Sequence, residues 1–246
     1  MLCFFLSAVL PLKALSSDGC LPPPDTEKVE VVSVLDGDTL RLRDGRIIRL
    51  IGIDTPELGR DGRPDMAGAT EAKAVMQRLI GESRNLLYLR KGREKRDRHR
   101  RWLAHLYTFE SVNISAEMLR RGLGYQITVP PNLAHLSCYR SAETEARKSS
   151  SGLWRYPVRS ADSLAGDETG FHILRGKIER VGRSRSAVWL NLAGGLAIRI
   201  TWGDWAGFPL ADPDELIGRH VEFRGWLYQR NGEQRVRIRH PASIDW

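Results

Sequence analysis

The stretch D-G-D-T-L-R-L-R-D-G-R-I-I-R-L-I-G-I-D-T-P-E, residues Asp36–Glu57, indicates how the first half of this chain folds. Leu40 and Leu42 alternate with arginines, which predicts a strand with one apolar face. A tight-turn signal, Asp-Gly, follows at residues 44–45, and the apolar run over residues 47–53 predicts a buried return strand. The sequence therefore predicts a β-hairpin that carries acidic residues at both of its ends.

These acidic residues form the first candidate site. A two-stranded antiparallel ribbon returns its last residues to the level of its first, so we expect Asp38 and Asp54 to lie close together. Crowded carboxylates repel each other, and a bound cation is the usual compensation. Oxygen ligands favour Ca²⁺ or Mg²⁺ over zinc. With Arg49 on the return strand, a metal, an acid and an arginine meet at one point, which suits phosphate chemistry.

Three blocks of sequence carry a resemblance to a known family. The block D-G-D-T at Asp36–Thr39 is followed by R-L-I-G-I-D-T-P-E at Arg49–Glu57 and by D-R-H-R-R-W-L-A-H-L-Y at Asp97–Tyr107. In this order the blocks resemble the motifs of the thermonuclease, or staphylococcal-nuclease-like, family, and the resemblance covers residues 29–157. It implies a mainly β fold with helices, in which a five-stranded OB-fold barrel is flanked by three helices.

The resemblance also implies an activity and roles for individual residues. It implies a calcium-dependent nuclease that hydrolyses phosphodiester bonds of DNA, RNA or both and leaves 3′-phosphate ends. Glu57 would orient or deprotonate the attacking water, and Arg49 and Arg101 would hold the phosphoryl oxygens, because the planar guanidinium binds two oxygens at once. The Ca²⁺ ligands would be Asp38, Asp54 and the backbone carbonyl of Thr55.

One position departs from the family's pattern. The family usually has glycine immediately before the last arginine, and this chain has Arg100 there. That side chain would either crowd Arg101 or add a phosphate contact. It also leaves open whether Arg100 or Arg101 is aligned with the last arginine of the family's motif. The following Leu103-Ala104 favours Arg101 as the catalytic residue.

The alternative function is a catalytically silent, nucleic-acid-binding OB-fold protein. Such domains occur in the same family and typically lose the acids and arginines of the site. All five of these positions are filled in this chain, which favours the enzyme.

The charge of the chain favours a polyanionic partner, here a nucleic acid substrate. The 246 residues carry a net charge of +8, of which +6 falls on residues 1–165. Residues 90–101 hold eight Lys or Arg and two acids. This run is either a solvated hairpin loop or a substrate-binding loop, and in the second case Lys91, Arg93 and Arg100 contact the nucleic acid.

The N-terminus predicts export. Residues 2–12 are an apolar run that is too short to span a bilayer, and small residues follow at positions 14 and 16. Residues 1–16 are therefore predicted to be a signal peptide, which places the mature protein in the periplasm or outside the cell with no membrane contact. The run lacks a preceding Lys or Arg, and a buried N-terminal strand is the alternative.

Cysteine usage predicts one disulfide. Removal of the signal peptide takes away Cys3 and leaves Cys20 and Cys138, which an oxidising compartment allows to pair. The alternative for Cys138 is a small, buried, apolar residue. The sequence has no C-x-x-C pair and no His–Cys cluster, which argues against zinc.

The composition divides the chain into two domains. The nuclease-like domain is predicted over residues 27–157, and a small and polar linker follows over residues 158–170. Residues 171–246 contain five predicted strands, one short helix late in the order and a hairpin turn at Asn231-Gly232. This pattern predicts a second small, OB-like β-barrel.

An aromatic and basic face is predicted on this second barrel. Alternation along residues 221–228 places Trp226 and Tyr228 on the outer face, and Arg237 joins them after the turn. Aromatics that stack on bases and arginines that neutralise phosphates are typical of single-strand-binding OB folds. The alternative is a barrel exterior on which arginine stems cover the rings. The other outer positions are Glu222, Arg224, Arg235 and Arg239.

Overall fold

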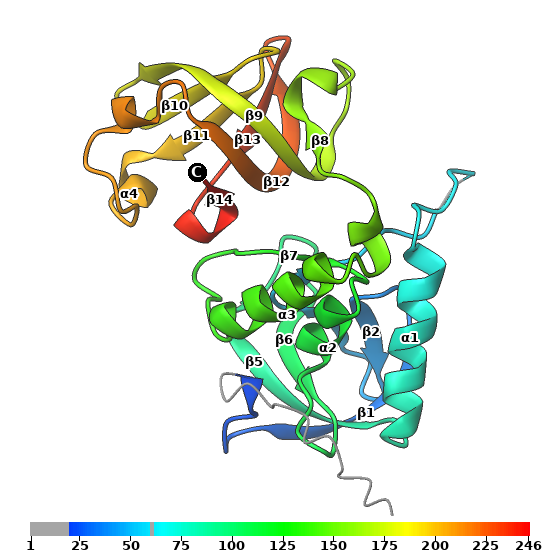
Figure 1. Cartoon of the computed structure of the whole chain (residues 1–246). Helices are drawn as coiled ribbons and strands as arrows, with labels where there is room; N and C mark the ends of the chain where they lie inside the picture. Colours follow the sequence, from blue (N-terminus) through cyan, green and yellow to red (C-terminus); the bar gives the residue numbers. More distant parts are fainter. Residues whose placement is uncertain (1–19, 60–61) are drawn as a thin grey trace, which may run out of the picture.

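The computed structural model describes residues 20–59 and 62–246, and their strands form two closed barrels joined by one connection (Figure 1). Over these described residues the fold is mainly β with four α-helices, which confirms the predicted fold class. The predicted signal peptide, residues 1–16, lies outside the described residues. None of the described helices is long and apolar enough to cross a membrane.

The first barrel closes in the strand order β1-β2-β3-β6-β5. Its interior is made by the alternate apolar residues of these strands, such as Leu40, Ile48 and Leu106, none of which is exposed to solvent. The short strands β4 and β7 pair with each other in a separate two-stranded sheet. The bounds are β1 Glu27–Val34, β2 Thr39–Leu42, β3 Ile47–Leu50, β4 Ile53–Asp54, β5 Leu86–Arg96, β6 Trp102–Tyr107 and β7 Tyr125–Gln126.

Three helices cover this barrel: α1 Ala69–Glu82, α2 Ile114–Arg120 and α3 Leu136–Lys148. The buried face of α1 includes Ala72 and Met76 and packs into the same core as the strands. Asn113 caps the N-terminus of α2, because its side chain accepts a hydrogen bond from the Ala116 N–H at 3.1 Å. Cys20, just before β1, is joined to Cys138 of α3 by a disulfide with a Cα–Cα distance of 5.8 Å.

The basic run over residues 90–101 is mostly strand rather than loop. β5 continues through Arg96 and pairs with β6, with Arg96 opposite Trp102. The Arg96 guanidinium lies 4.2 Å and the Lys91 ammonium 5.2 Å from the centre of the Trp102 ring. These cation–π contacts allow a strongly basic strand to pair with its neighbour. The hairpin turn is confined to residues 97–101.

The second barrel consists of β9 Gly170–Arg183, β10 Ala187–Leu192, β11 Ala197–Thr201, β12 His220–Arg230 and β13 Glu233–Arg237, and it is closed by pairing of β12 with β9. Two short strands, β8 Arg159–Ser160 and β14 Ile244–Asp245, extend the sheet. β8 and the buried Ala161 lie in the segment predicted as a linker, so this segment contacts the second barrel. The other helices with bounds in the described part of the chain are α4 Trp202–Trp205 and the 3₁₀ turns Gly152–Arg155, Ala161–Ser163, Pro213–Leu216 and Pro241–Ser243.

A buried ion pair joins the two barrels. Arg224 of β12 was predicted to face solvent, but its Nη1 donates to both carboxylate oxygens of Glu143 on α3, at 2.9 and 2.7 Å. The same nitrogen donates to the Gln126 carbonyl oxygen on β7 at 3.0 Å, and Glu143 Oε1 accepts the Gln126 N–H at 2.7 Å. Glu222 is also partly covered, because it pairs with Arg147 of α3. The outer face of β12 at these two positions is therefore an interface between domains.

Candidate active site

A cluster of acids surrounds one buried arginine at the end of the first barrel. Arg49 on β3 lies opposite Thr39 of β2, which brings it next to Asp38. The Arg49 guanidinium forms ion pairs with both Asp38 and Asp54. The structure thus brings the carboxylates of Asp38 and Asp54 together, as the predicted hairpin requires, and Arg49 lies between them.

Two features hold Asp38 in one orientation. Its Oδ2 accepts hydrogen bonds from the N–H of Thr55 at 2.8 Å and from Thr55 Oγ1 at 3.0 Å, while Oδ1 accepts from Thr39 Oγ1 at 2.9 Å. Gly37 allows this close approach, since a Cβ atom there would lie 2.8 Å from both Ala72 Cβ and Thr55 Oγ1. The D-G-D-T block is therefore required by packing as well as by charge.

A break in the return strand positions Asp54. Residues 47–53 were predicted to form one strand, but β3 ends at Leu50 and β4 begins at Ile53. Gly52 has φ of +85°, a left-handed conformation, and a Cβ atom at this position would overlap the Tyr139 ring. The turn redirects the chain so that β4 pairs with β7, and Asp54 lies at the end of β4, directly opposite Tyr125.

The site holds more negative than positive charge. Burial, with the charge of Asp38 as the next cause, raises the pKa of Asp36 to about 6. Burial also raises the pKa of Asp54 to about 7, although Arg49 opposes this shift. Burial alone would lower the pKa of Arg49, but the surrounding carboxylates outweigh burial and the pKa is raised. One arginine does not neutralise these carboxylates, so a further cation would stabilise their charged forms.

Glu57 lies just beyond β4 and is exposed. Its negative charge adds, after larger causes, to the raised pKa of both Asp36 and Asp54, so it is close enough to interact with the acid cluster. A solvent-facing carboxylate at the edge of a buried charged cluster is suited to orienting a water molecule.

Of the two candidate arginines, Arg101 faces the acid cluster. Its Nη1 lies 3.5 Å from Thr39 Oγ1, which is itself bonded to Asp38, and its Nε donates to Asp97 at 2.7 Å. Arg100 is exposed and has φ of +65°, the left-handed conformation that glycine adopts most easily. This backbone conformation gives a physical reason for glycine at the matching position of the family's motif. The geometry favours the register in which Arg101 is the functional residue.

The oxygen donors fit a hard cation. Across residues 20–59 and 62–246, no group of three or more His, Cys, Asp or Glu side chains has the arrangement of a metal site. The ligand set suggested by the resemblance has only two such side chains, Asp38 and Asp54, and takes its third oxygen from the backbone of Thr55. Two carboxylates and a carbonyl, in a cluster with surplus negative charge, suit Ca²⁺ or Mg²⁺.

The predicted substrate-binding residues fall into two groups. On the β5–β6 hairpin, Arg93 and Arg100 are exposed, and Lys91 forms an ion pair with Glu27 at 3.4 Å. This group includes the turn that positions Arg101.

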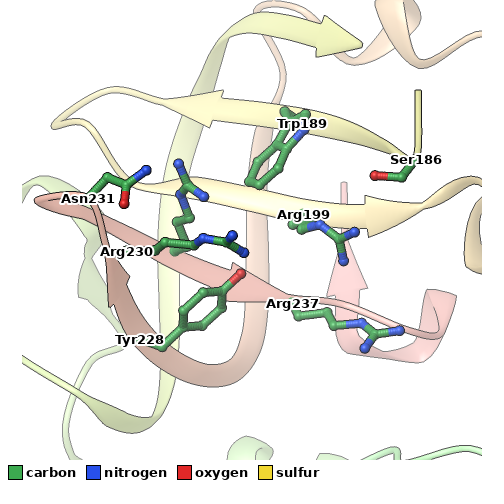
Figure 2. Close-up of a pocket in the computed structure, with 8 residues that line it drawn as sticks. Ser186, Trp189, Arg199, Tyr228, Arg230, Asn231 and Arg237 are labelled. Carbon is green, nitrogen blue, oxygen red and sulfur yellow. The ribbon is translucent and has the colours of Figure 1, made fainter. Parts of the chain in front are cut away.

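The second group lies on the other barrel and is only partly as predicted. Trp226 packs edge-on against Phe171 of the same barrel, with ring centres 5.1 Å apart, and it lines a pocket with residues 127–129 of the first domain, so it lies at the junction between the domains. Tyr228 and Arg237 line a pocket with Trp189 and Arg199, which sequence reasoning missed (Figure 2). The alternation of buried and partly buried positions along β10 and β11, expected for strands with one core-facing side, is the signal that could have identified these two.

Comparison with known proteins places the first barrel in a family. The family described as "Staphylococcal nuclease homologue" matches residues 47–156. An "Uncharacterized endonuclease" of Escherichia coli O157:H7 is 32% identical over 130 residues, which cover 50% of this chain and 74% of that protein. A "Thermonuclease" of Staphylococcus intermedius is 28% identical over 154 residues, 59% of this chain and 89% of the relative. A "Probable endonuclease LCL3" of Verticillium alfalfae is 33% identical over 137 residues, 53% of this chain and 44% of the relative.

These matches overlap the part of the chain in which the three motif blocks lie, and the acid cluster is built from the same blocks. The chain belongs to the staphylococcal nuclease family.

Proposed function

We propose that this chain is a calcium-dependent nuclease that hydrolyses phosphodiester bonds of DNA, RNA or both. The observation that carries the proposal is the buried Arg49 paired with Asp38 and Asp54, in a chain that belongs to the staphylococcal nuclease family. The names of these relatives, thermonuclease and endonuclease, agree with this activity.

Asp38, Asp54 and the backbone carbonyl of Thr55 are the residues that would hold the ion. When bound, Ca²⁺ supplies positive charge close to the phosphodiester and so reduces its repulsion of a nucleophile. The donors from Thr39 and Thr55 hold the Asp38 carboxylate in one orientation. A preoriented carboxylate lowers the cost of assembling the site.

The chain's own residues account for the rest of the reaction. Arg49 and Arg101 hold the non-bridging phosphoryl oxygens as negative charge builds on them. Glu57 orients the attacking water and accepts its proton. The scissile bond is the one whose cleavage leaves a 3′-phosphate and a 5′-hydroxyl, and this choice rests on the resemblance alone.

The basic hairpin supplies the electrostatic attraction for the substrate. Lys91, Arg93 and Arg100 lie on β5 or in the turn that leads directly to Arg101. Each phosphate contact that is removed should lower the dependence of log affinity on log salt by about 0.9 for duplex DNA. Replacing Arg93 with glutamine should therefore raise KM and leave kcat nearly unchanged.

The proposed location is the periplasm or the outside of the cell. The disulfide between Cys20 and Cys138 supports this location, because such bonds persist in oxidising compartments. Mass spectrometry of the mature protein would locate its first residue, and a chain that still begins at Met1 would contradict export by signal cleavage.

The test of the activity is digestion of DNA and of RNA by the purified chain. Parallel reactions contain Ca²⁺, Mg²⁺ or excess chelator, and the products are analysed for 3′-phosphate ends. Cleavage with Ca²⁺ and none with chelator is the expected result. Binding without cleavage under every condition would favour the catalytically silent protein instead.

A further inference from the structure

One outer face of the second barrel carries two aromatic rings among arginines. Trp189 on β10 lies opposite Arg199 on β11, and Arg199 lies opposite Arg237 on β13. On the same strand, Arg235 pairs with Tyr228 of β12. Since paired residues point to the same side of a sheet, these side chains form one face. The intervening residues are buried in the core: Val188, Leu190, Ile198, Leu227 and Val236.

This face is hollowed into a pocket of about 560 Å³ that also includes Arg230 and Asn231. Figure 2 shows the Arg230 side chain between the rings of Trp189 and Tyr228, and Arg199 and Arg237 to one side of the rings. A pocket of this size can take a flat organic group of the size of a nucleotide.

The arginines of the pocket are only half neutralised. Arg235 pairs with Glu233 at 2.6 Å, and Arg237 pairs with Asp204 at 3.3 Å. Within the described part of the chain, no carboxylate forms an ion pair with the other two, Arg199 and Arg230. The pocket therefore carries a surplus of positive charge and favours an anionic ligand.

The aromatic rings of the pocket indicate which kind of anionic ligand it binds. Two guanidinium groups lie over the Trp189 ring, Arg235 at 4.9 Å and Arg199 at 5.8 Å from its centre, so a base that stacks on this ring takes the place of one of them. A nucleobase offers a flat face of the same kind, whereas inorganic phosphate does not. Duplex DNA keeps its base faces stacked inside the helix, so only an unpaired strand presents both phosphates and base faces to this surface.

We propose that this pocket binds single-stranded nucleic acid, with a base stacked on Trp189 or Tyr228 and the phosphates on the arginines. The inference extends the proposed nuclease function, because it names the form of nucleic acid that the second barrel holds for the first.

The position of the pocket relative to the acid cluster supports this ligand. A second pocket of about 280 Å³ shares Tyr228 and Arg237 with the first and reaches residues 127–129. Those residues directly follow β7, whose Tyr125 lies opposite Asp54. The Tyr125 ring also stacks on Phe171 of the second barrel, with centres 6.0 Å apart. A bound strand can thus extend along the domain junction toward the acid cluster.

The test measures binding by the full chain in excess chelator, where the proposed cleavage does not proceed. The probe is a fluorescein-labelled oligothymidine followed by anisotropy. Trp189→Ala is expected to weaken binding roughly 5- to 150-fold, the range for loss of one stacked base. The double variant Arg199→Gln/Arg230→Gln is expected to lower the log–log salt slope by about 1.4, at 0.7 for each single-strand phosphate contact.

The matched control is Arg219→Gln, which removes one exposed arginine of the same barrel that lines neither pocket. Circular dichroism verifies the fold, and Trp189→Leu replaces Trp189→Ala if the alanine variant unfolds. Variants of the pocket that bind like the control would overturn the inference. Equal affinity for duplex, unchanged in the Trp189 variants, would also overturn it and reduce the pocket to a general polyanion surface.

Cleavage and binding are measured in separate assays, so failure of the proposed nuclease function can be distinguished from failure of the proposed pocket function. If the chain cleaves nucleic acid in Ca²⁺ but the pocket variants bind normally, the inference fails and the nuclease function stands. If pocket-dependent binding is found without any cleavage, the inference stands and the nuclease function fails.

Discussion

Replacing Arg224 with methionine would remove one half of the ion pair that joins the two barrels. Arg224 and Glu143 have side chains that are 7% and 6% exposed, so neither charge is well hydrated. Methionine has a similar length and an apolar surface that suits the buried site. The change leaves the Glu143 carboxylate buried with the Gln126 N–H as its remaining hydrogen-bond donor from this network.

The expected cost follows from this burial. Removing one partner of a buried ion pair typically destabilises a protein by about 3–5 kcal/mol, because the other charge is left without compensation. Adding Glu143→Gln should recover most of this loss, since a neutral amide oxygen can still accept the Gln126 N–H. The control is Arg140→Gln, which removes the exposed pair with Asp245 and should cost at most about 1 kcal/mol.

The assay is urea unfolding of the full chain, followed by both tryptophan fluorescence and circular dichroism. Two signals are needed because two barrels can unfold in separate transitions. The reasoning would be refuted if Arg224→Met cost no more than Arg140→Gln, or if adding Glu143→Gln made the single variant still less stable.

Further predictions concern the register of the motif, the disulfide and one buried histidine. Arg101→Ala should lower kcat about 10²–10³-fold, while Arg100→Ala should leave kcat nearly unchanged. Initial cleavage rates with the reverse pattern would show that Arg100, and not Arg101, is aligned with the arginine of the family's motif. The disulfide Cys20–Cys138 joins residues that are 118 positions apart. In the chain-entropy model its reduction should lower the free energy of unfolding by ~4–5 kcal/mol. A urea midpoint that does not change when reductant is added would contradict this. Burial, with the charge of His135 as a lesser cause, lowers the pKa of His105 to about 3. The unfolded chain then takes up a proton at this histidine below pH 6.5 that the folded chain does not, so His105 should contribute a fall of ~1.4 kcal/mol per pH unit to the free energy of unfolding from pH 6.5 toward 3. The raised pKa values of Asp36 and Asp54 contribute in the opposite direction, so the contribution of His105 is measured as a difference between the unmodified chain and a variant. His105→Gln should reduce this slope, and equal slopes in urea melts would argue against the histidine.

The sequence predicted the central hairpin well because its pattern is local. Strand alternation and the Asp-Gly turn determine which residues of the hairpin lie opposite each other, and this pairing brings Asp38 next to Arg49. The same reasoning did not find the break at Gly52, because that turn depends on the Tyr139 ring from α3, which is distant in sequence.

Residues of the second barrel were harder to place for the same physical reason. Alternation correctly assigned Arg224 to the outer face of β12, but it contains no information on what covers that face. The partner, Glu143, lies in the other domain. Trp189 and Arg199 face the pocket by the same alternation, but their proximity to Tyr228 depends on the order of strands in the closed barrel.

The most direct test of the proposed site separates ion binding from cleavage in two variants, Asp54→Asn and Glu57→Gln. Calorimetry measures the Ca²⁺ affinity of each variant, and the rate of DNA cleavage is measured at saturating Ca²⁺. We expect Asp54→Asn to lower both the Ca²⁺ affinity and the cleavage rate. Glu57→Gln should bind Ca²⁺ like the unmodified chain but cleave about 10²–10³-fold more slowly, the range for loss of one catalytic proton-transfer group. Cleavage by both variants at the rate of the unmodified chain would contradict the assignment of this acid cluster as the active site.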